Sequence, residues 1–254
     1  MRRKTVSAAL LSLSLLTFAG AAGAQNGQVI VSAKVVNIFW GPSFSNPASP
    51  DYLYAQSLVA FRNQFGTTSE YNVITQYFGS NGQVQLTNLG SGTADWFDSS
   101  TPPTNVTDSA VRSKILVYLS THAFNNSTIY EVFLPSTSYS SSGSSTSCGG
   151  PGLAYCEYHS FFTNGGFTIK YTVQPYASCS ACQVSGWTPA QSQEHLVSLS
   201  TRTTVIDPLG NNWHDASGIE LGDKCAWSPA PFLDGGFGYS YFWSLATRSC
   251  VRTR

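Results

Sequence analysis

The sequence predicts an α+β fold: a single domain with a mixed β-sheet, helices packed on the sheet, and stabilising disulfides. Strand-like and helix-like periodicities are intermixed through residues 28–134, which is typical of a sheet covered by helices. A hairpin and a long helix with a polar loop follow in the C-terminal half, where all six cysteines lie. Because no internal repeat or linker interrupts the chain, we expect residues 25–254 to form one domain with a sizeable core.

The N-terminal segment, residues 1–24, is typical of a secretory signal peptide. Three basic residues precede an apolar run at 6–18 that is too short to span a membrane. The small residues Ala22, Gly23 and Ala24 predict cleavage after Ala24. The product is therefore expected to be secreted or periplasmic. No membrane span is expected, since no later apolar run is long enough.

Composition excludes two classes of partner. Charged residues make up 10% of the chain, and the formal net charge is +0. A neutral balance argues against electrostatic binding to nucleic acid or to an anionic membrane. The low charge, with abundant small polar residues and tyrosine, is common in exported surface proteins. The oligomeric state is left open.

The N-terminal half alternates between strands and helices. Alternating apolar residues predict a strand over 28–40. Residues 51–65 follow the 3.6-residue period of a helix, with Gly66 at the C-terminal cap. Asp108 can cap a further helix that extends to His122. Further strands are expected over residues 71–78, 83–89 and 129–134.

The middle of the chain contains a low-complexity segment and a hairpin. Residues 135–152 are rich in serine and glycine, so we expect a surface loop tied down by Cys148. Asn164-Gly165-Gly166 separates strands predicted at 153–162 and 167–176, which is a hairpin signal. Residues 232–250 form an aromatic, glycine-rich tail with strand character.

The most specific stretch of the sequence is a helix over residues 188–206 and the loop after it. Thr188 is a good N-cap, Pro189 suits the first helical position, and Gln191 completes a capping box. Pro208 ends the helix because proline disfavours helical geometry in the preceding residue. The loop is dense in oxygen ligands, namely Asp207, Asn211, Asn212, Asp215, Glu220 and Asp223.

Several motifs in and before this loop carry a family resemblance. They are Asp207-Pro208-Leu209-Gly210, Trp213-His214-Asp215, Glu220-Leu221-Gly222-Asp223-Lys224-Cys225-Ala226-Trp227, Asn37-Ile38-Phe39-Trp40-Gly41 and Tyr155-Cys156-Glu157-Tyr158-His159-Ser160. The chain thereby resembles the phosphate-induced protein 1 (EXORDIUM-like) family. Members of that family are extracellular or wall-associated and are linked in plants to growth and cell expansion. The resemblance touches most of the mature chain and is strongest between Asp207 and Trp227.

The chain departs from that family at one critical place. The usual run before Asp-Pro is His-Glu-x-x-Glu-Ala-x-Thr, which resembles the metal-binding helix of a zincin. In this sequence the three functional positions hold Leu199, Ser200 and Thr203. Leucine has no lone pair, and a hydroxyl is a poor zinc ligand and a poor base. We therefore expect a zincin-like core whose helix is catalytically silent, as in a pseudoenzyme.

Glu194 and His195 are the only weak catalytic candidates on this helix. With Gln191 they approximate the inverted zincin motif His-x-x-Glu-His, but glutamine stands in place of the first histidine. Adjacent residues on a helix point about 100° apart, so the two side chains would diverge. Chance explains the match better, because drawing the pair into the site requires a shift of the helix that displaces Leu196 and Leu199 from the core.

The polar loop offers a second set of candidates. Asp207, Asp215, Glu220 and Asp223 could bind calcium through oxygen atoms, although the spacing is not an EF-hand. His214 could recruit a metal such as zinc together with Asp215. The competing interpretation is that these carboxylates accept backbone hydrogen bonds, and that His214 replaces the tyrosine usual in the family. We expect His159 to be a half-buried structural histidine rather than a ligand.

The cysteines predict three disulfides. An even number in an exported chain favours complete pairing, with no free thiol. Cys225 and Cys250 are the preferred pair because both flank the aromatic tail, and the other four would pair among themselves. The spacing of Cys179 and Cys182 is that of a redox motif, but a structural role is favoured. The six cysteines are Cys148, Cys156, Cys179, Cys182, Cys225 and Cys250.

Two functions from different classes follow. The first is a secreted EXORDIUM-like protein without catalysis that binds a cell-wall or surface carbohydrate or protein. Aromatic side chains would stack on sugar rings, although most of them are also expected in the core. The stacking candidates are Trp213, Trp227, Tyr239, Tyr241 and Trp243. The alternative is a secreted zinc-dependent, peptidase-like hydrolase with unusual ligands.

Overall fold

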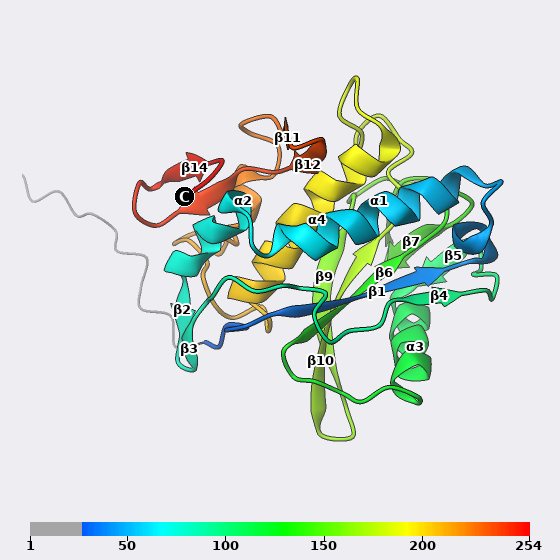
Figure 1. Cartoon of the computed structure of the whole chain (residues 1–254), viewed down its shortest axis with the longest axis horizontal. Helices are drawn as coiled ribbons and strands as arrows, with labels where there is room; N and C mark the ends of the chain where they lie inside the picture. Colours follow the sequence, from blue (N-terminus) through cyan, green and yellow to red (C-terminus); the bar gives the residue numbers. More distant parts are fainter. Residues whose placement is uncertain (1–26) are drawn as a thin grey trace, which may run out of the picture.

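A five-stranded β-sheet runs through the middle of the protein, with helices on both faces (Figure 1). The computed structural model describes residues 27–254, so the predicted signal peptide lies outside the described residues. The strand order is β4-β1-β6-β10-β9, and every neighbouring pair is parallel except β10 with the edge strand β9. The strands are β1 (Lys34–Trp40), β4 (Trp96–Asp98), β6 (Thr128–Phe133), β9 (Tyr158–Asn164) and β10 (Phe167–Gln174).

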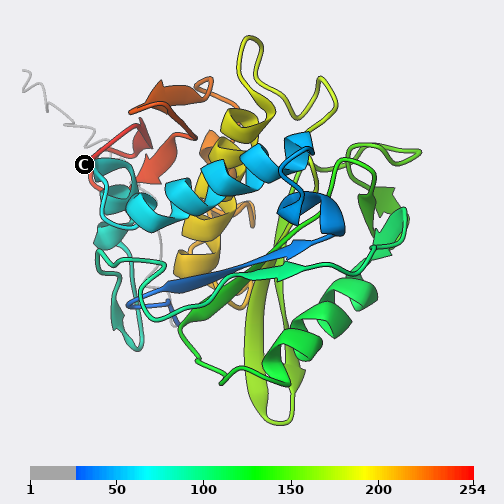
Figure 2. The ribbon, with the colours of Figure 1, turned by 45° about the vertical axis from the view of Figure 1, so that its right-hand side comes forward.

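Helices α1 and α4 cover one face of this sheet, and α3 covers the other (Figure 2). The two faces follow from the alternation of side chains along each strand. On β1, Val35 and Phe39 face α1 and α4, whereas Val36 and Ile38 face α3. The helices are α1 (Pro50–Phe65), α2 (Ser69–Asn72), α3 (Asp108–Leu119) and α4 (Pro189–Ile206).

Smaller elements surround this core. Three 3₁₀ helices are η1 (Pro42–Ser45), η2 (Val73–Gln76) and η3 (Asp223–Cys225). A short sheet joins β5 (Asn105–Thr107), β7 (Tyr139–Ser142) and β8 (Ser145–Thr146). Three two-stranded ribbons pair β2 (Phe78–Gly79) with β3 (Gly82–Gln83), β11 (Phe232–Asp234) with β12 (Phe237–Tyr239), and β13 (Phe242–Ser244) with β14 (Ser249–Val251). The mixed α+β class predicted from the sequence is confirmed.

Helix α4 is almost entirely buried although much of its sequence is polar. Its capping box is formed as predicted, with reciprocal hydrogen bonds between Thr188 and Gln191. Every residue from 192 to 206 is buried. The polar side chains are satisfied by neighbouring elements: Thr201 donates to Glu131 of β6, and Arg202 donates to the Ser240 carbonyl. The helix is therefore held between the central sheet and the C-terminal ribbons.

Two of the expected strands are wrong. Residues 71–78 form α2, η2 and only the start of β2, because the Thr68 side chain caps a helical turn by accepting from the Tyr71 N–H. A short apolar run reads equally well as a strand or as a buried helical turn. Residues 83–89 form a ladder only at Gln83, and the rest is irregular, with the Gln85 N–H donating to the Val31 carbonyl of a loop.

Further boundaries or environments differ from the prediction. The first strand begins at Lys34 instead of residue 28, α3 ends at Leu119 instead of His122, and the strand predicted at 153–162 is β9 at 158–164. The segment 135–152 is not merely a surface loop, since it contains β7 and β8. Ser140 and Ser147 within it are fully buried, and the Ser147 hydroxyl accepts from the Ser140 N–H. A serine-rich composition can be buried where each hydroxyl finds a partner.

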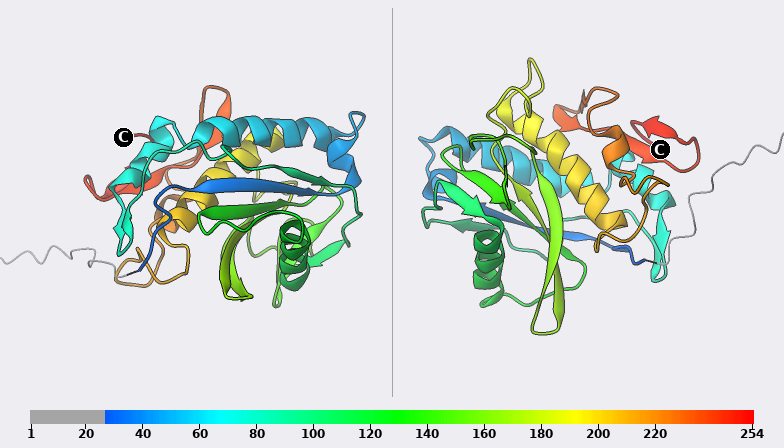
Figure 3. Two further views of the ribbon diagram at one scale, coloured as in Figure 1. Left: turned by 60° about the horizontal axis from the view of Figure 1, so that its bottom comes forward. Right: turned by 180° about the vertical axis from the view of Figure 1, so that it is seen from behind.

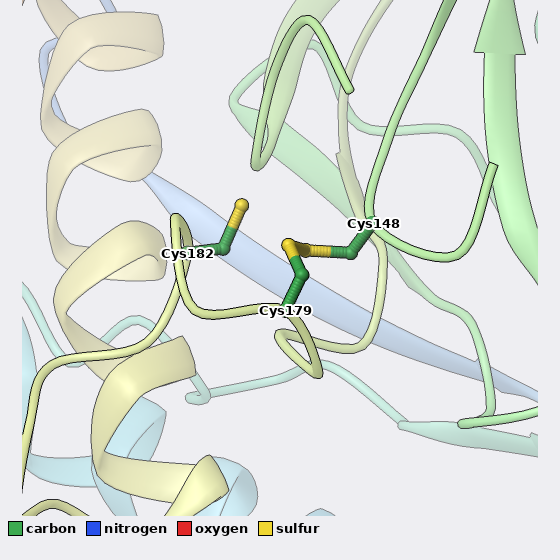
Figure 4. Close-up of side chains that lie close together, drawn as sticks. All are labelled: Cys148, Cys179 and Cys182. Carbon is green, nitrogen blue, oxygen red and sulfur yellow. A yellow bond between two sulfur atoms is a disulfide. The ribbon is translucent and has the colours of Figure 1, made fainter. Parts of the chain in front are cut away.

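The three predicted disulfides are present, and within residues 27–254 no cysteine is free. The preferred pair, Cys225–Cys250, is confirmed, and the other four cysteines form Cys148–Cys179 and Cys156–Cys182. Figure 4 shows the first of these bonds beside Cys182. Because Cys179 and Cys182 belong to different disulfides, they do not form a redox pair, and this sulfur cluster is not a metal centre. No helix within the described range is long and apolar enough to cross a membrane.

Candidate functional site

A cleft of about 380 Å³ lies along one side of α4. Figure 3 shows α4 from behind, between β9 and the segment that follows the helix. Two disulfides tie the segment before β9 to the segment before α4, and so fix one wall of the cleft. The lining is largely apolar, with carboxylates from two different segments. The lining residues are Leu153, Ala154, Tyr155, Cys156, Glu157, Ala181, Leu196, Leu199, Asp223, Ala226 and Trp227.

The helix contributes only apolar side chains to this cleft, Leu196 and Leu199. The other two positions of the expected metal-binding motif are engaged within the fold. Ser200 accepts from Gln174 of β10 and donates to the Leu196 carbonyl, whereas the Thr203 hydroxyl donates to the Leu199 carbonyl at 3.0 Å. Neither hydroxyl is directed at the cleft by these bonds, so α4 offers the cleft no ligand or base.

Glu194 is fully buried on another side of α4. Its Oε1 accepts from the Ser57 hydroxyl at 2.6 Å, and its Oε2 accepts from the Gly238 N–H at 2.9 Å. Burial raises the pKa of the Glu194 carboxyl above its ordinary value. Both oxygens serve to attach α4 to α1 and to β12.

His195 is fully buried next to it, against the inner side of Trp227. The ring centroids of His195 and Trp227 are 4.7 Å apart in an edge-on arrangement, and Nδ1 lies 3.1 Å from the Ser240 hydroxyl. Burial lowers the pKa of the His195 imidazole to about 3, so the ring is neutral at physiological pH. The structure therefore places both weak catalytic candidates in the interior.

A cluster of potential ligands lies just beyond the C-terminus of α4. Asp207, His214 and Glu220 each direct one ligand atom into a common space, with all three atoms within 4.8 Å of one another. His214 Nε2 is 3.5 Å from Asp207 Oδ2 and 3.9 Å from Glu220 Oε1. The structure thus brings together three of the five residues that the sequence suggested for a metal.

Local backbone geometry explains how the three side chains converge. Asp207 ends α4, and its Oδ1 accepts from two backbone N–H groups, those of Asn211 and Asn212. Trp213 has a positive φ of 48°, which is uncommon for a bulky residue and turns the chain sharply. His214 and Glu220 then form an isolated antiparallel bridge. Residues opposite each other in such a pair present their side chains on the same face.

Residues of the β9 region also contribute to this site, which the loop sequence did not indicate. His159 Nε2 lies 2.9 Å from Glu220 Oε2 and forms an ion pair with it. Burial opposes the charge on each group, but their mutual contact prevails, raising the pKa of His159 and lowering that of Glu220. Burial also raises the pKa of Glu157, which immediately precedes β9 and lies near His159, to about 8.

The other two metal-ligand candidates of the loop, Asp215 and Asp223, lie outside this cluster. Asp215 accepts from the backbone of Ser217 and Ile219 through Oδ1, and its Oδ2 pairs with Lys224 at 2.7 Å. It therefore belongs to the turn between His214 and Glu220 and is not a member of the three-residue cluster. Asp223 is exposed and lines the cleft.

The five aromatic stacking candidates divide by burial. Trp213 and Tyr239 are core residues, 3% and 2% exposed, which removes them as stacking platforms. Trp213 instead donates its indole N–H to the Phe78 carbonyl. Tyr241 and Trp243 are half-buried, whereas Trp227 is 43% exposed at the mouth of the cleft. Trp227 is therefore the candidate with a face available to a ligand.

Comparison of the chain with protein-family models, with curated proteins and with solved structures found no match.

Proposed function

We propose that this chain is a secreted, EXORDIUM-like binding protein in which a zincin-like scaffold presents a non-catalytic, carbohydrate-binding cleft. The observation that carries the proposal is the cleft surface of α4, which is made of Leu196 and Leu199, with Leu199 at the position where the family has the first residue of its metal-binding motif. The mixed sheet, the helix packed across it and the polar loop after that helix agree with the layout expected of a zincin-like core.

The lack of metal-ligating side chains on the cleft side of α4 favours a binding role over hydrolysis. Zinc hydrolases hold the metal with three protein ligands and keep a base beside one open position. On α4 the corresponding positions are filled by Leu199, Ser200 and Thr203, and the two hydroxyls are committed to hydrogen bonds inside the fold. Glu194 and His195 are buried away from solvent and engaged with other elements.

The lining of the cleft suits a sugar. Trp227 and Leu153 both line the cleft and are each 43% exposed, so they provide apolar surface for the flat face of a sugar ring. Glu157 and Asp223 supply oxygen acceptors for hydroxyl groups. An apolar surface with a few placed polar groups is the usual design of a small-ligand site.

An extracellular location is part of the same proposal. The N-terminal sequence is typical of export, and three disulfides are consistent with an oxidising compartment. A wall or surface polysaccharide is then the ligand within reach of the protein.

Binding to a glycan array and to insoluble wall polysaccharides tests the proposal. We expect saturable binding to at least one polysaccharide, weakened tenfold or more by Trp227→Ala and by Glu157→Ala. Phe167→Ala is the matched control, since Phe167 is an exposed aromatic at the distant hairpin tip between β9 and β10. Binding that responds equally to Phe167→Ala and Trp227→Ala, or no binding to any glycan, would refute the assignment of the cleft.

A further inference from the structure

The cluster formed by Asp207, His214 and Glu220 is separate from the surface that α4 presents to the cleft. Its three facing atoms are Asp207 Oδ2, His214 Nε2 and Glu220 Oε1. The distances of 3.5 and 3.9 Å from His214 Nε2 exceed those of ordinary hydrogen bonds. The three side chains therefore surround a common point without satisfying one another.

Asp207 and Glu220 each use one carboxylate oxygen in a contact within the fold and direct the other oxygen toward His214. Asp207 Oδ1 accepts two backbone N–H groups, and Glu220 Oε2 is in contact with His159. The free oxygens, Asp207 Oδ2 and Glu220 Oε1, are the ones that face His214. This is the arrangement by which outer partners orient metal-ligating carboxylates in proteins.

Asp207 supplies an independent sign of a ligand site. Its side chain is 1% exposed, and its Oδ2 has no hydrogen-bond partner in the region from residue 27 to residue 254. A buried carboxylate oxygen without a partner is costly, because it has lost water and gained nothing in return. A cation at the centre of the cluster would satisfy it.

We infer that Asp207, His214 and Glu220 form a binding site for a divalent metal of the zinc class, in which His159 positions Glu220. Around zinc, with ligands at about 2.0 Å, neighbouring ligand atoms lie about 3.3 Å apart. The observed 3.5 and 3.9 Å are close to this separation, so small side-chain movements close the site. Two carboxylates also match the charge of the ion.

The combination of one imidazole and two carboxylates favours a metal such as zinc over calcium. Calcium takes six to eight oxygen ligands, whereas a neutral imidazole suits zinc, copper or nickel. His214 and Glu220 are 24% and 22% exposed, so the site opens to solvent on one side and can hold a water as fourth ligand. The metal would join the end of α4 to both arms of the His214–Glu220 turn. It would thereby fix the loop that leads to the cleft residues Asp223 and Trp227.

The test is calorimetric titration of the full exported chain, with its disulfides formed and its metals removed by chelator. Zinc and calcium are titrated in separate experiments. We expect one zinc per chain, and at least a tenfold loss of affinity in His214→Phe and in Glu220→Gln. Asp215→Asn is the matched control for a carboxylate in the same loop, and His122→Ala is the control for an exposed histidine. Neither control should change zinc affinity.

His159 requires its own pair of variants. Loss of an outer partner typically weakens metal binding by about 10- to 100-fold. We expect this loss in His159→Leu and its recovery in His159→Gln, whose amide can still donate to Glu220. Circular dichroism and the disulfide map establish that each variant is folded.

Three results would overturn the assignment. The first is no zinc binding by the folded wild type. The second is stoichiometric zinc binding that persists undiminished in His214→Phe. The third is calcium binding that equals zinc binding and does not depend on His214, because that would define a site of oxygens alone. Glycan binding is measured separately, through Trp227, which is not a ligand in this cluster, so failure here is distinguishable from failure of the proposed function.

Discussion

His195 provides a sharp test of whether α4 is a core element or a catalytic one. Its imidazole is fully buried, and burial lowers its pKa from 6.5 to about 3. A lowered pKa in the folded state means that unfolding takes up a proton below pH 6.5. The stability that neutral His195 contributes is therefore complete above pH 6.5 and is lost progressively as the pH falls toward 3.

The magnitude follows from the shift. Each pKa unit corresponds to about 1.4 kcal/mol, so at pH 4.5 the wild type should have lost roughly 3 kcal/mol of unfolding free energy through His195 alone. His195→Phe keeps a ring against Trp227 and has no titrating group, so it lacks this loss. His195→Phe also loses the contact with Ser240, which lowers its free energy of unfolding by the same amount at every pH. This constant difference does not affect how the two pH profiles diverge.

Urea denaturation at a series of pH values from 8 to 4.5 measures both profiles. The difference between wild type and His195→Phe should shift by roughly 3 kcal/mol in favour of the variant as the pH falls. Parallel profiles, or an NMR titration of His195 near pH 6.5, would show that the imidazole is solvated and that its placement in the core is wrong.

Three further predictions concern the helix and its surroundings. A β-carbon on Gly222 would overlap the Thr203 hydroxyl oxygen, so Gly222→Ala should destabilise the fold by about 1–3 kcal/mol. The double variant with Thr203→Ala should be more stable than Gly222→Ala alone in thermal melts, and a double variant no more stable than Gly222→Ala would contradict this. Thr188→Ala removes the N-cap and should cost about 1 kcal/mol by urea denaturation; an unchanged midpoint would mean that the cap contributes nothing. Burial raises the pKa of Glu131 to about 7, so its contribution to stability is complete below pH 4.5 and is lost as the pH rises through 7. Relative to wild type, Glu131→Gln should therefore have up to about 3 kcal/mol more free energy of unfolding at pH 8 and no more at pH 4. Equal differences at both pH values would contradict the burial argument.

The long periodic elements were predictable because their signals are local. The capping box at Thr188 and the apolar period of α1 specify helices without any knowledge of the rest of the chain. The hairpin of β9 and β10 follows in the same way from its glycine turn. Residues 71–78 failed because a short apolar run takes its conformation from the core that surrounds it.

The candidate site was predictable only where it is contiguous in sequence. Asp207, His214 and Glu220 belong to one loop, and their ligand chemistry is visible in the sequence. Glu157 and His159 come from the β9 region, and the contact of His159 with Glu220 depends on how that edge strand packs beside the loop. No local pattern encodes such a contact. The burial of Trp213 and Tyr239 was likewise a property of the assembled core.

The central claim is that α4 presents a binding surface and performs no hydrolysis. The most direct measurement is an assay of the zinc-supplemented chain against a broad peptide library, with cleavage products detected by mass spectrometry. We predict no turnover above the buffer background, for the wild type and for His195→Ala alike, even if zinc is bound at His214. Zinc-dependent turnover would contradict the account, and its loss in His195→Ala would place a hydrolytic site on α4 itself.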